Sequence, residues 1–171
     1  MKFLAAILYS RGLGVETRLF PELETILGRI DYRGRGYPFT NTDYYEDEMG
    51  PELHRMIVSF EPLGSPTGIV DLKLGTAQIE DKFKENGSRR VNIDPGYIDY
   101  FKVVLASFKE GPQKIYLGKG VYADPVLLYQ SGAFEPLPWS FPDLKQGIYM
   151  EDFKAIRAIY REARRAGGPD K

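Results

Sequence analysis

The spacing of apolar residues alternates along this chain between the period of a strand and the period of a helix, and that order restricts the possible folds. A continuous apolar run over residues 3–9 predicts a buried strand, and helical spacing follows over residues 15–30. After a polar, tyrosine-rich stretch that reads as extended, residues 54–63 predict another strand and residues 69–86 an amphipathic helix. With a strand over residues 89–94, the first half predicts the order β-α-β-β-α-β.

Short strands fill the second half of the chain. Gly or Pro separates them at intervals of about 8–12 residues, which is typical of an antiparallel meander, and a helix over residues 152–166 follows. The expected strands are residues 101–108, 114–120, 121–130 and 133–139. We therefore predict an α+β fold: a mainly antiparallel sheet with a ferredoxin-like βαββαβ start and a β-meander, helices on one face, and a C-terminal helix. We expect residues 1–171 to form a single domain with a disordered tail at 165–171.

The charge balance, the absence of cysteine and the single histidine exclude several classes of function. Because 23 basic residues oppose 24 acidic ones, no overall field attracts the chain to nucleic acid or to an anionic membrane. Without cysteine there is no disulfide, thiolate metal site or cysteine nucleophile, and one histidine, His54, cannot build a zinc site of several imidazoles. No apolar run approaches the roughly 20 residues that span a bilayer, so we expect a cytoplasmic protein with no membrane contact.

The stretch TDYYEDEMG, residues 42–50, crowds four carboxylates beside two tyrosines. In an extended stretch alternate residues share a face, so Asp43, Tyr45 and Asp47 would point to one side and Glu46 to the other. Two carboxylates about 7 Å apart on one face can share a divalent cation, since hard cations prefer oxygen ligands. The alternative is a solvated edge strand whose charges discourage aggregation.

The segment NIDPGY, residues 92–97, fits a type II turn at the end of a strand, because Pro95 fixes φ and Gly96 supplies a positive φ. Such a turn brings the Cα atoms of Asp94 and Tyr97 within about 7 Å, which sets a carboxylate beside a phenol. That pair would suit a site facing a ligand. The alternative is that Asp94 accepts hydrogen bonds only from the backbone of the turn.

The segment YLGKGVYAD, residues 116–124, predicts a hairpin with Lys119 at its tip between two glycines. Backbone N–H groups flanked by glycine, together with an ammonium group, can hold a phosphate. The alternative is that hairpin geometry alone explains the glycines. The chain has no G-x-x-x-x-G-K-[ST] phosphate loop, so a nucleotide site would have to be built in another way.

Together these segments predict a cleft at one rim of the sheet that binds an anionic small molecule such as a nucleotide. Its carboxylates would take Mg²⁺, and phosphoryl or nucleotidyl transfer would suit such a site. The predicted catalytic residues are Asp43, Asp94 and Tyr97. The predicted ligand-binding residues are Tyr45, Arg90, Lys119 and Tyr122, and the predicted metal ligands are Asp43, Glu46, Asp94 and Asp124.

The second hypothesis is a non-catalytic interaction module. Arg157, Arg161 and Arg164 form a stripe at helical spacing on the last predicted helix, and they would contact RNA phosphates or an acidic protein. The alternative for this stripe is a solvated face whose cations suit the negative end of the helix. The sequence alone does not decide between an interaction module and a small-molecule site.

Several segments resemble, in order, a prokaryotic domain family of unknown function. The densest of them are TDYYE.EMG, NIDPGY and IYLGKGVYAD, and the others are FLAAILYS, SFEPL, VLASFKEG and WSFPD. The resemblance spans nearly the whole chain, and some members of that family carry the label GTP-binding protein. It supplies no catalytic residues. It implies that these polar motifs identify the family. The three densest motifs are also the segments in which carboxylates, tyrosines and Lys119 suggest a site.

Overall fold

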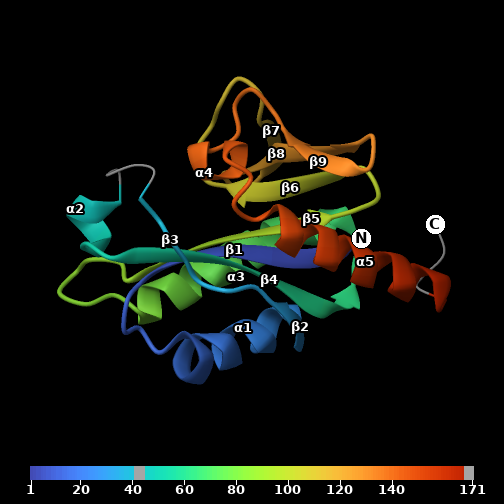
Figure 1. Cartoon of the computed structure of the whole chain (residues 1–171). Helices are drawn as coiled ribbons and strands as arrows, with labels where there is room; N and C mark the ends of the chain where they lie inside the picture. Colours follow the sequence, from blue (N-terminus) through green and yellow to red (C-terminus); the bar gives the residue numbers. More distant parts are fainter. Residues whose placement is uncertain (41–44, 168–171) are drawn as a thin grey trace.

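The computed structural model describes residues 1–40 and 45–167, and in these ranges it contains one open antiparallel sheet of nine strands (Figure 1). The strands are β1 (Lys2–Ser10), β2 (Ile30–Arg33), β3 (Tyr37–Pro38), β4 (Leu53–Leu63), β5 (Val91–Ile98), β6 (Lys102–Ser107), β7 (Ile115–Gly118), β8 (Val121–Gln130) and β9 (Ala133–Pro136). The α-helices are α1 (Phe20–Leu27), α2 (Glu46–Met49), α3 (Ile69–Lys82), α4 (Pro142–Lys145) and α5 (Met150–Arg165). No helix in the described ranges is long and apolar enough to cross a membrane. The predicted tail lies partly outside these ranges, at residues 168–171.

The first half of the sheet has the strand order β2-β4-β1-β5, and each neighbouring pair is antiparallel. Helix α1 connects β1 to β2, and α3 connects β4 to β5. This is the βαββαβ arrangement of ferredoxin-like folds, with the short strand β3 added along β4. The predicted α+β fold with a ferredoxin-like start is therefore confirmed.

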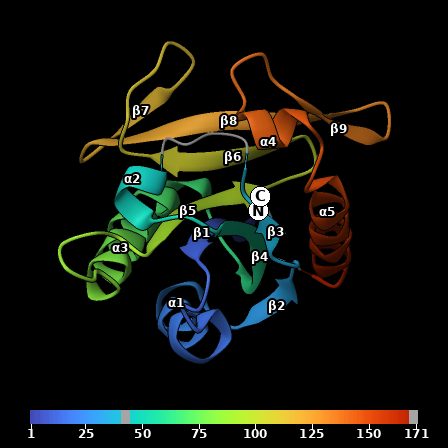
Figure 2. The ribbon, with the colours of Figure 1, turned by 60° about the vertical axis from the view of Figure 1, so that its left-hand side comes forward.

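The second half extends the same sheet through β6, β8 and β7. All pairs in this half are antiparallel, as predicted. Strand β8 is the long central strand: β6 pairs along one side of it, and β7 and β9 pair near its two ends. Since β6 occupies one side, β7 and β9 lie along the other. Figure 2 shows β6 and β7 on the two sides of β8.

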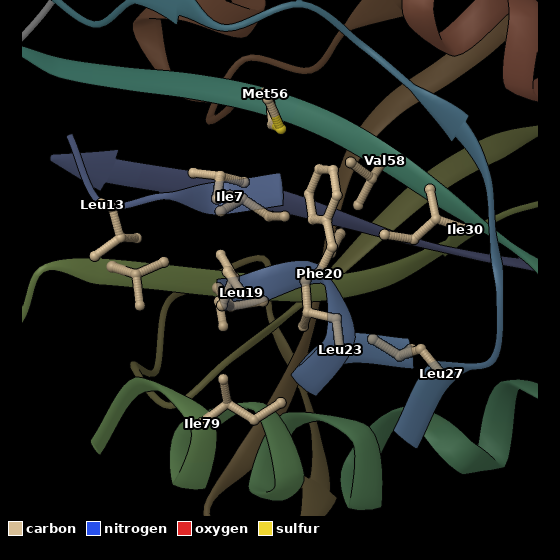
Figure 3. Close-up of a cluster of buried hydrophobic side chains, with 14 of the residues drawn as sticks. Ile7, Leu13, Leu19, Phe20, Leu23, Leu27, Ile30, Met56, Val58 and Ile79 are labelled. Atoms are coloured by element: carbon tan, nitrogen blue, oxygen red, sulfur yellow. The ribbon is translucent and has the colours of Figure 1, made fainter. Parts of the chain in front are cut away.

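Strand β1 divides the hydrophobic core into two layers, because successive side chains of a strand point to opposite faces. Ile7 lies in the layer between the sheet and helices α1 and α3, with Phe20 and Ile79 (Figure 3). Leu4 and Ala6 belong to the layer on the other face. All of these side chains are almost completely buried, so β1 is a central strand with no solvent-facing side.

Helices α4 and α5 cover the second face of the sheet. Leu144 of α4 is buried there with Phe153 and Ile156 of α5. Figure 2 shows α5 on the opposite side of the sheet from α1 and α3. Helix α5 thus closes the fold, as the apolar spacing of its sequence predicts.

The expectation that a turn ends the strand at NIDPGY is wrong. Strand β5 continues through this segment, and Pro95 and Gly96 lie opposite Ala5 and Leu4 of β1. The local preference of Pro-Gly for a turn is overridden because β5 pairs with the central strand along its whole length. The stretch at 42–48 also differs from the prediction: Glu46–Met49 form the short helix α2 instead of a strand, and residues 41–44 lie outside the described ranges.

Gly96 lies where β5 and β6 approach each other closely. A Cβ atom at this position would lie 2.2 Å from the carbonyl oxygen of Val104 and 2.9 Å from Cδ2 of Leu105. The backbone of β6 cannot give way as a flexible side chain would. A glycine is therefore needed at this position to keep β5 and β6 paired.

We predict that Gly96→Ala lowers the free energy of unfolding by about 2–3 kcal/mol, because the added methyl group forces the two strands apart. Urea denaturation measures the change. Gly68→Ala is the matched control, since its Cβ would lie 3.5 Å from Cζ of Phe3, an ordinary contact. We expect the control to stay within about 0.5 kcal/mol of the wild type, and equal effects of the two substitutions would contradict the packing argument.

Candidate functional site

Strands β5 and β6 form a fork. They pair over only three residues on each side, 96–98 of β5 with 103–105 of β6. Pro95, next to the point where pairing stops, has no backbone N–H to donate. A cavity of about 480 Å³ beside this point is lined by Asn92 and Asp94 of β5 and by residues 105–107 of β6, among others, and this volume suits a small organic ligand.

Aromatic rings and charged groups together form most of the cavity wall. The aromatic lining residues are Phe39, Tyr45, Phe108 and Phe141. The charged lining residues are Lys73, Arg89, Lys109, Lys114, Asp94, Asp124 and Asp143. The other lining residues are Asn92, Leu105, Ala106, Ser107 and Pro142. A flat, polar molecule could therefore find both apolar surface and hydrogen-bonding groups here.

Lys73 of α3 and Asp94 of β5 form a buried ion pair at the fork. Nζ of Lys73 donates to Oδ1 of Asp94 at 2.9 Å and to the carbonyl oxygen of Ile93 at 2.8 Å. Nδ2 of Asn92 donates to the other carboxylate oxygen at 3.0 Å. Burial alone would raise the pKa of Asp94, but Lys73, helped by Arg55 and Asn92, holds it below its usual value. Asp94 is therefore a charged carboxylate at neutral pH.

Arg89 connects α2, α3 and β5 at the cavity. Its guanidinium donates to both carboxylate oxygens of Glu48, at 2.6 and 2.7 Å, and to Oδ1 of Asn92 at 2.9 Å. It also lies 3.4 Å from one oxygen of Glu80, whose other oxygen accepts from the N–H of Ile93 at 2.7 Å. The hydrogen bonds from Arg89 lower the pKa of Glu48, whereas burial raises the pKa of Glu80.

Lys114 and Asp124 form a second ion pair in the wall. Nζ of Lys114 lies 3.3 Å from Oδ2 of Asp124 and donates to Oγ of Ser107 at 3.0 Å. Nε2 of Gln113 donates to Oδ1 of Asp124 at 3.2 Å. Both side chains of the pair are about nine-tenths buried. The charge of Asp124 is therefore already balanced within the protein.

Arg55 of β4 and Asp143 of α4 form a third, deeply buried pair. Nη1 of Arg55 donates to Oδ2 of Asp143, and the hydroxyl of Tyr149 donates to the same oxygen at 2.9 Å. The guanidinium carbon of Arg55 lies 4.4 Å from the ring centroid of Phe39 and 5.8 Å from that of Phe141, both of which line the cavity. Burial, followed by the charge of Asp143, raises the pKa of Tyr149, so this phenol remains a neutral donor.

Three of the residues that the sequence singles out line this cavity. Asp94 comes from β5, Asp124 from β8, and Tyr45 directly precedes α2. They meet because β5, β6 and β8 are consecutive strands in the sheet, although Asp94 and Asp124 are distant in sequence. Their predicted catalytic, metal-binding and ligand-binding roles stay predictions.

Two other predicted residues lie outside the cavity wall. Tyr97 packs beside Ile69 and Val104 on the helix α3 side of the sheet. Because it is three residues from Asp94 on one strand, the two side chains point to opposite faces. Lys119 lies at the tip of the β7–β8 hairpin, where it is largely exposed and pairs with Asp71 at 3.0 Å.

Three further predicted residues, Arg90, Tyr122 and Glu46, do not line the cavity. Arg90 contacts Glu85 at 3.4 Å, and it donates to the carbonyl oxygen of Met49 at 3.3 Å. Tyr122 packs against Tyr116 with ring centroids 5.2 Å apart. Glu46 is exposed on α2, and Asp43 lies outside the described residues.

No group of three or more Asp, Glu or His side chains within residues 1–40 and 45–167 is placed to hold a metal ion. Asp94 and Asp124, two of the predicted metal ligands, are each paired with a lysine. Because Asp43 lies outside these ranges, the magnesium site stays a prediction.

Sequence reasoning missed the buried polar side of α3. Lys73, Thr76 and Glu80 are each at most 6% exposed. With Ile69 and Phe83 they follow one another at spacings of four, three, four and three residues, which places all five on one stripe of the helix. Polar residues in phase with an apolar stripe are a signal of a buried polar site, and that signal was available in the sequence.

Apart from Tyr45, the aromatic residues of the wall and Asp143 carried no such chemical signal. Phe39, Phe108 and Phe141 lie in connections between elements, and Asp143 lies in a four-residue helix. Phe108 falls in VLASFKEG, and Phe141 and Asp143 fall in WSFPD, but the sequence does not indicate that these segments meet; the sheet and α4 bring them together.

We predict that Lys73→Met lowers the free energy of unfolding by about 3–5 kcal/mol, because it leaves the carboxylate of Asp94 buried without its cation. The double variant Lys73→Met with Asp94→Leu should recover most of this loss, as measured by urea denaturation. Lys119→Met is the control, since its ion pair is exposed and contributes less than about 1 kcal/mol. The pairing argument fails if the single variant is no less stable than this control.

A pH titration tests the same ion pair independently. The pKa of Asp94 is lowered in the folded chain, relative to about 3.9 when unfolded. The ionised carboxylate therefore contributes stability above about pH 4, and this contribution is lost as the pH falls through the folded-state pKa. We expect the stability difference between the wild type and Asp94→Asn to be constant near neutral pH and to shrink on acidification below about pH 4. A difference that grows in acid would contradict the lowered pKa.

Comparison with known proteins identifies the family of the chain. A family model described as a domain of unknown function, DUF4416, matches residues 1–160. No curated protein and no solved structure gives a significant match. The matched range includes every residue that lines the cavity. The chain therefore belongs to the DUF4416 family of domains of unknown function.

Proposed function

We propose that this protein binds a small organic molecule that carries a flat ring and an anionic group, as a nucleotide does, in the cavity between β5 and β6. The observation that carries the proposal is the composition of the wall, where four aromatic rings and four cationic side chains surround about 480 Å³. Cavities of this size with a mostly apolar lining and a few polar groups are typical of small-molecule sites.

The aromatic rings supply a surface for a flat ligand. Phe39, Tyr45, Phe108 and Phe141 come from separate parts of the chain and converge on the cavity. Phe108 and Phe141 are partly exposed, so their faces are open to contact. Stacking of an aromatic ligand on such rings adds to the hydrophobic gain and depends little on the identity of the heterocycle.

The charges favour an anion. Four cations and three carboxylates line the cavity, and Arg89 is engaged by Glu48 and Glu80, so attraction for an anionic group would come from Lys73, Lys109 and Lys114. Within the described part of the chain, Lys73 uses two of its three N–H donors, one for Asp94 and one for the carbonyl oxygen of Ile93. Its third donor can serve a ligand without breaking the ion pair.

The proposal does not depend on a metal held by the protein. A magnesium ion would enter with the phosphates of the ligand, which is how Mg²⁺ commonly binds in nucleotide sites. Phosphoryl or nucleotidyl transfer would require such an ion, whereas binding of the ligand requires no reaction.

The basic stripe on α5 is the weaker candidate site. Arg157 donates through Nε and Nη2 to the carbonyl oxygen of Tyr100, at 3.2 and 3.1 Å, and its guanidinium lies 3.5 Å from the ring centroid of Tyr129. It therefore anchors α5 to the rest of the fold. Arg161 is exposed and Arg164 is partly exposed, but exposed cations on one helix do not by themselves favour an RNA or protein interface over a solvated helix face.

Thermal denaturation with AMP, GMP, CMP, UMP, ATP and GTP, each with and without Mg²⁺, tests the proposal. At a concentration of about 100 times Kd, a bound nucleotide should stabilise the fold by about 2.7 kcal/mol, which raises the Tm by several degrees. We expect Lys109→Met, at the cavity, to weaken binding about tenfold, and Lys119→Met, at the exposed hairpin, to leave it unchanged. The proposal is overturned if no nucleotide shifts the Tm at millimolar concentration, or if the two variants behave alike.

A further inference from the structure

We propose that Asp143 accepts a hydrogen bond from an N–H group on the ring of the bound ligand, and so selects heterocycles that carry a donor. This inference rests on the proposed function and makes it more specific. It concerns which ring the cavity accepts, whereas the proposed function concerns whether the cavity binds a ring with an anionic group at all.

Asp143 has one oxygen engaged by the protein and one left over. Oδ2 accepts from Arg55 and from the hydroxyl of Tyr149, so the protein fixes this side of the carboxylate. Oδ1 is buried and has no hydrogen-bond partner among the described residues. A buried acceptor without a donor is costly, and each such group in a folded protein calls for an explanation.

The position of Asp143 supplies that explanation. The side chain is 1% exposed, yet the residue forms part of the cavity wall with Phe141 and Pro142 beside it. Nε of Arg55 and Oδ2 of Asp152 are also buried without a described partner, but neither residue lines the cavity. Among these three residues, Asp143 is therefore the one that combines an unpartnered buried oxygen with a place in the cavity wall.

The surroundings of Asp143 identify the chemical class of the donor. Phe39 and Phe141 line the cavity and also flank the guanidinium of Arg55, which holds Asp143. A flat ring against these two phenyl groups would have its edge next to the carboxylate. The torsion about the Cβ–Cγ bond of an aspartate is broad, so a small rotation presents Oδ1 to a ring N–H or to an exocyclic amino group.

A site with an unpaired acceptor discriminates strongly against a ligand without the donor, because the acceptor then stays unpaired in the complex. Asp143 thus acts as a residue that determines specificity. The lysines would bind the anionic group of any nucleotide, and Asp143 would distinguish bases that carry an N–H donor from those that do not.

Binding of matched nucleotides to the wild-type protein tests the inference. Calorimetry compares AMP with purine riboside 5′-monophosphate, CMP with 2-pyrimidinone riboside 5′-monophosphate, GMP with 1-methylinosine 5′-monophosphate, and UMP with 3-methyluridine 5′-monophosphate. Each second compound lacks the N–H donors of the first base. We expect the donor-free analogue of the tightest nucleotide to bind about tenfold more weakly or worse.

Two variants assign the effect to Asp143. In Asp143→Asn the amide can offer a donor where Oδ1 stood, so the preference for the parent nucleotide should disappear. Tyr149→Phe removes only a donor to Oδ2, and it should keep the preference. If Asp143→Asn does not fold, as judged by circular dichroism, the comparison of each nucleotide with its donor-free analogue on the wild-type protein still tests whether binding requires the N–H donor.

The outcomes separate the two proposals. Nucleotides that bind as tightly as their donor-free analogues would overturn the role of Asp143 and leave the proposed function standing, as would full preference in a folded Asp143→Asn variant. Failure of all the nucleotides to bind would overturn the proposed function, and the role of Asp143 with it.

Discussion

The contact between Lys73 and Asp94 is the interaction on which the site depends. Strands β5 and β6 pair closely at Gly96, where no side chain separates them, and then diverge. Divergent strands in the middle of a sheet leave polar groups that need partners. Lys73 meets this need by reaching from α3 to the carbonyl oxygen of Ile93 and to Asp94. The fork is thus a stable feature of the sheet, and the cavity is built on it.

The cavity is charged in its parts but almost neutral as a whole. Asp94, Asp124 and Asp143 are each paired with a cation from another segment of the chain. Buried charges that are paired in this way lock neighbouring elements together, and they are poor candidates for metal ligands or free acids. Recognition of a ligand would therefore rely on aromatic surface, on the remaining donors of the lysines and on the second oxygen of Asp143.

Much of the fold could be predicted from the sequence, because apolar spacing and chain order determine it. The β-α-β-β-α-β order and the closing helix follow directly from where the apolar residues recur. The Pro95-Gly96 pair misled the prediction, because a turn preference is local whereas pairing with β1 is a property of the whole sheet. Residues 46–49 misled it similarly, since a polar, tyrosine-rich composition does not by itself make a strand.

The site could be predicted only in part. Acidic residues next to strands, such as Asp94 and Asp124, stand out in a sequence, but their lysine partners come from distant segments. Lys73 resembles a surface lysine of an amphipathic helix, but its spacing from Ile69 and Phe83 places it on the buried stripe of that helix. Asp143 lies in the family-like segment WSFPD, but its residue type alone does not mark it as a site residue, because its importance comes from Arg55 and from the cavity beside it.

Hydrogen–deuterium exchange in the presence of a stabilising nucleotide tests most directly the claim that the fork between β5 and β6 is a binding site. The account predicts slower exchange at residues 105–109 and 141–143, which line the cavity, and unchanged exchange along α5. Unchanged exchange around the fork, with protection on α5 instead, would contradict it.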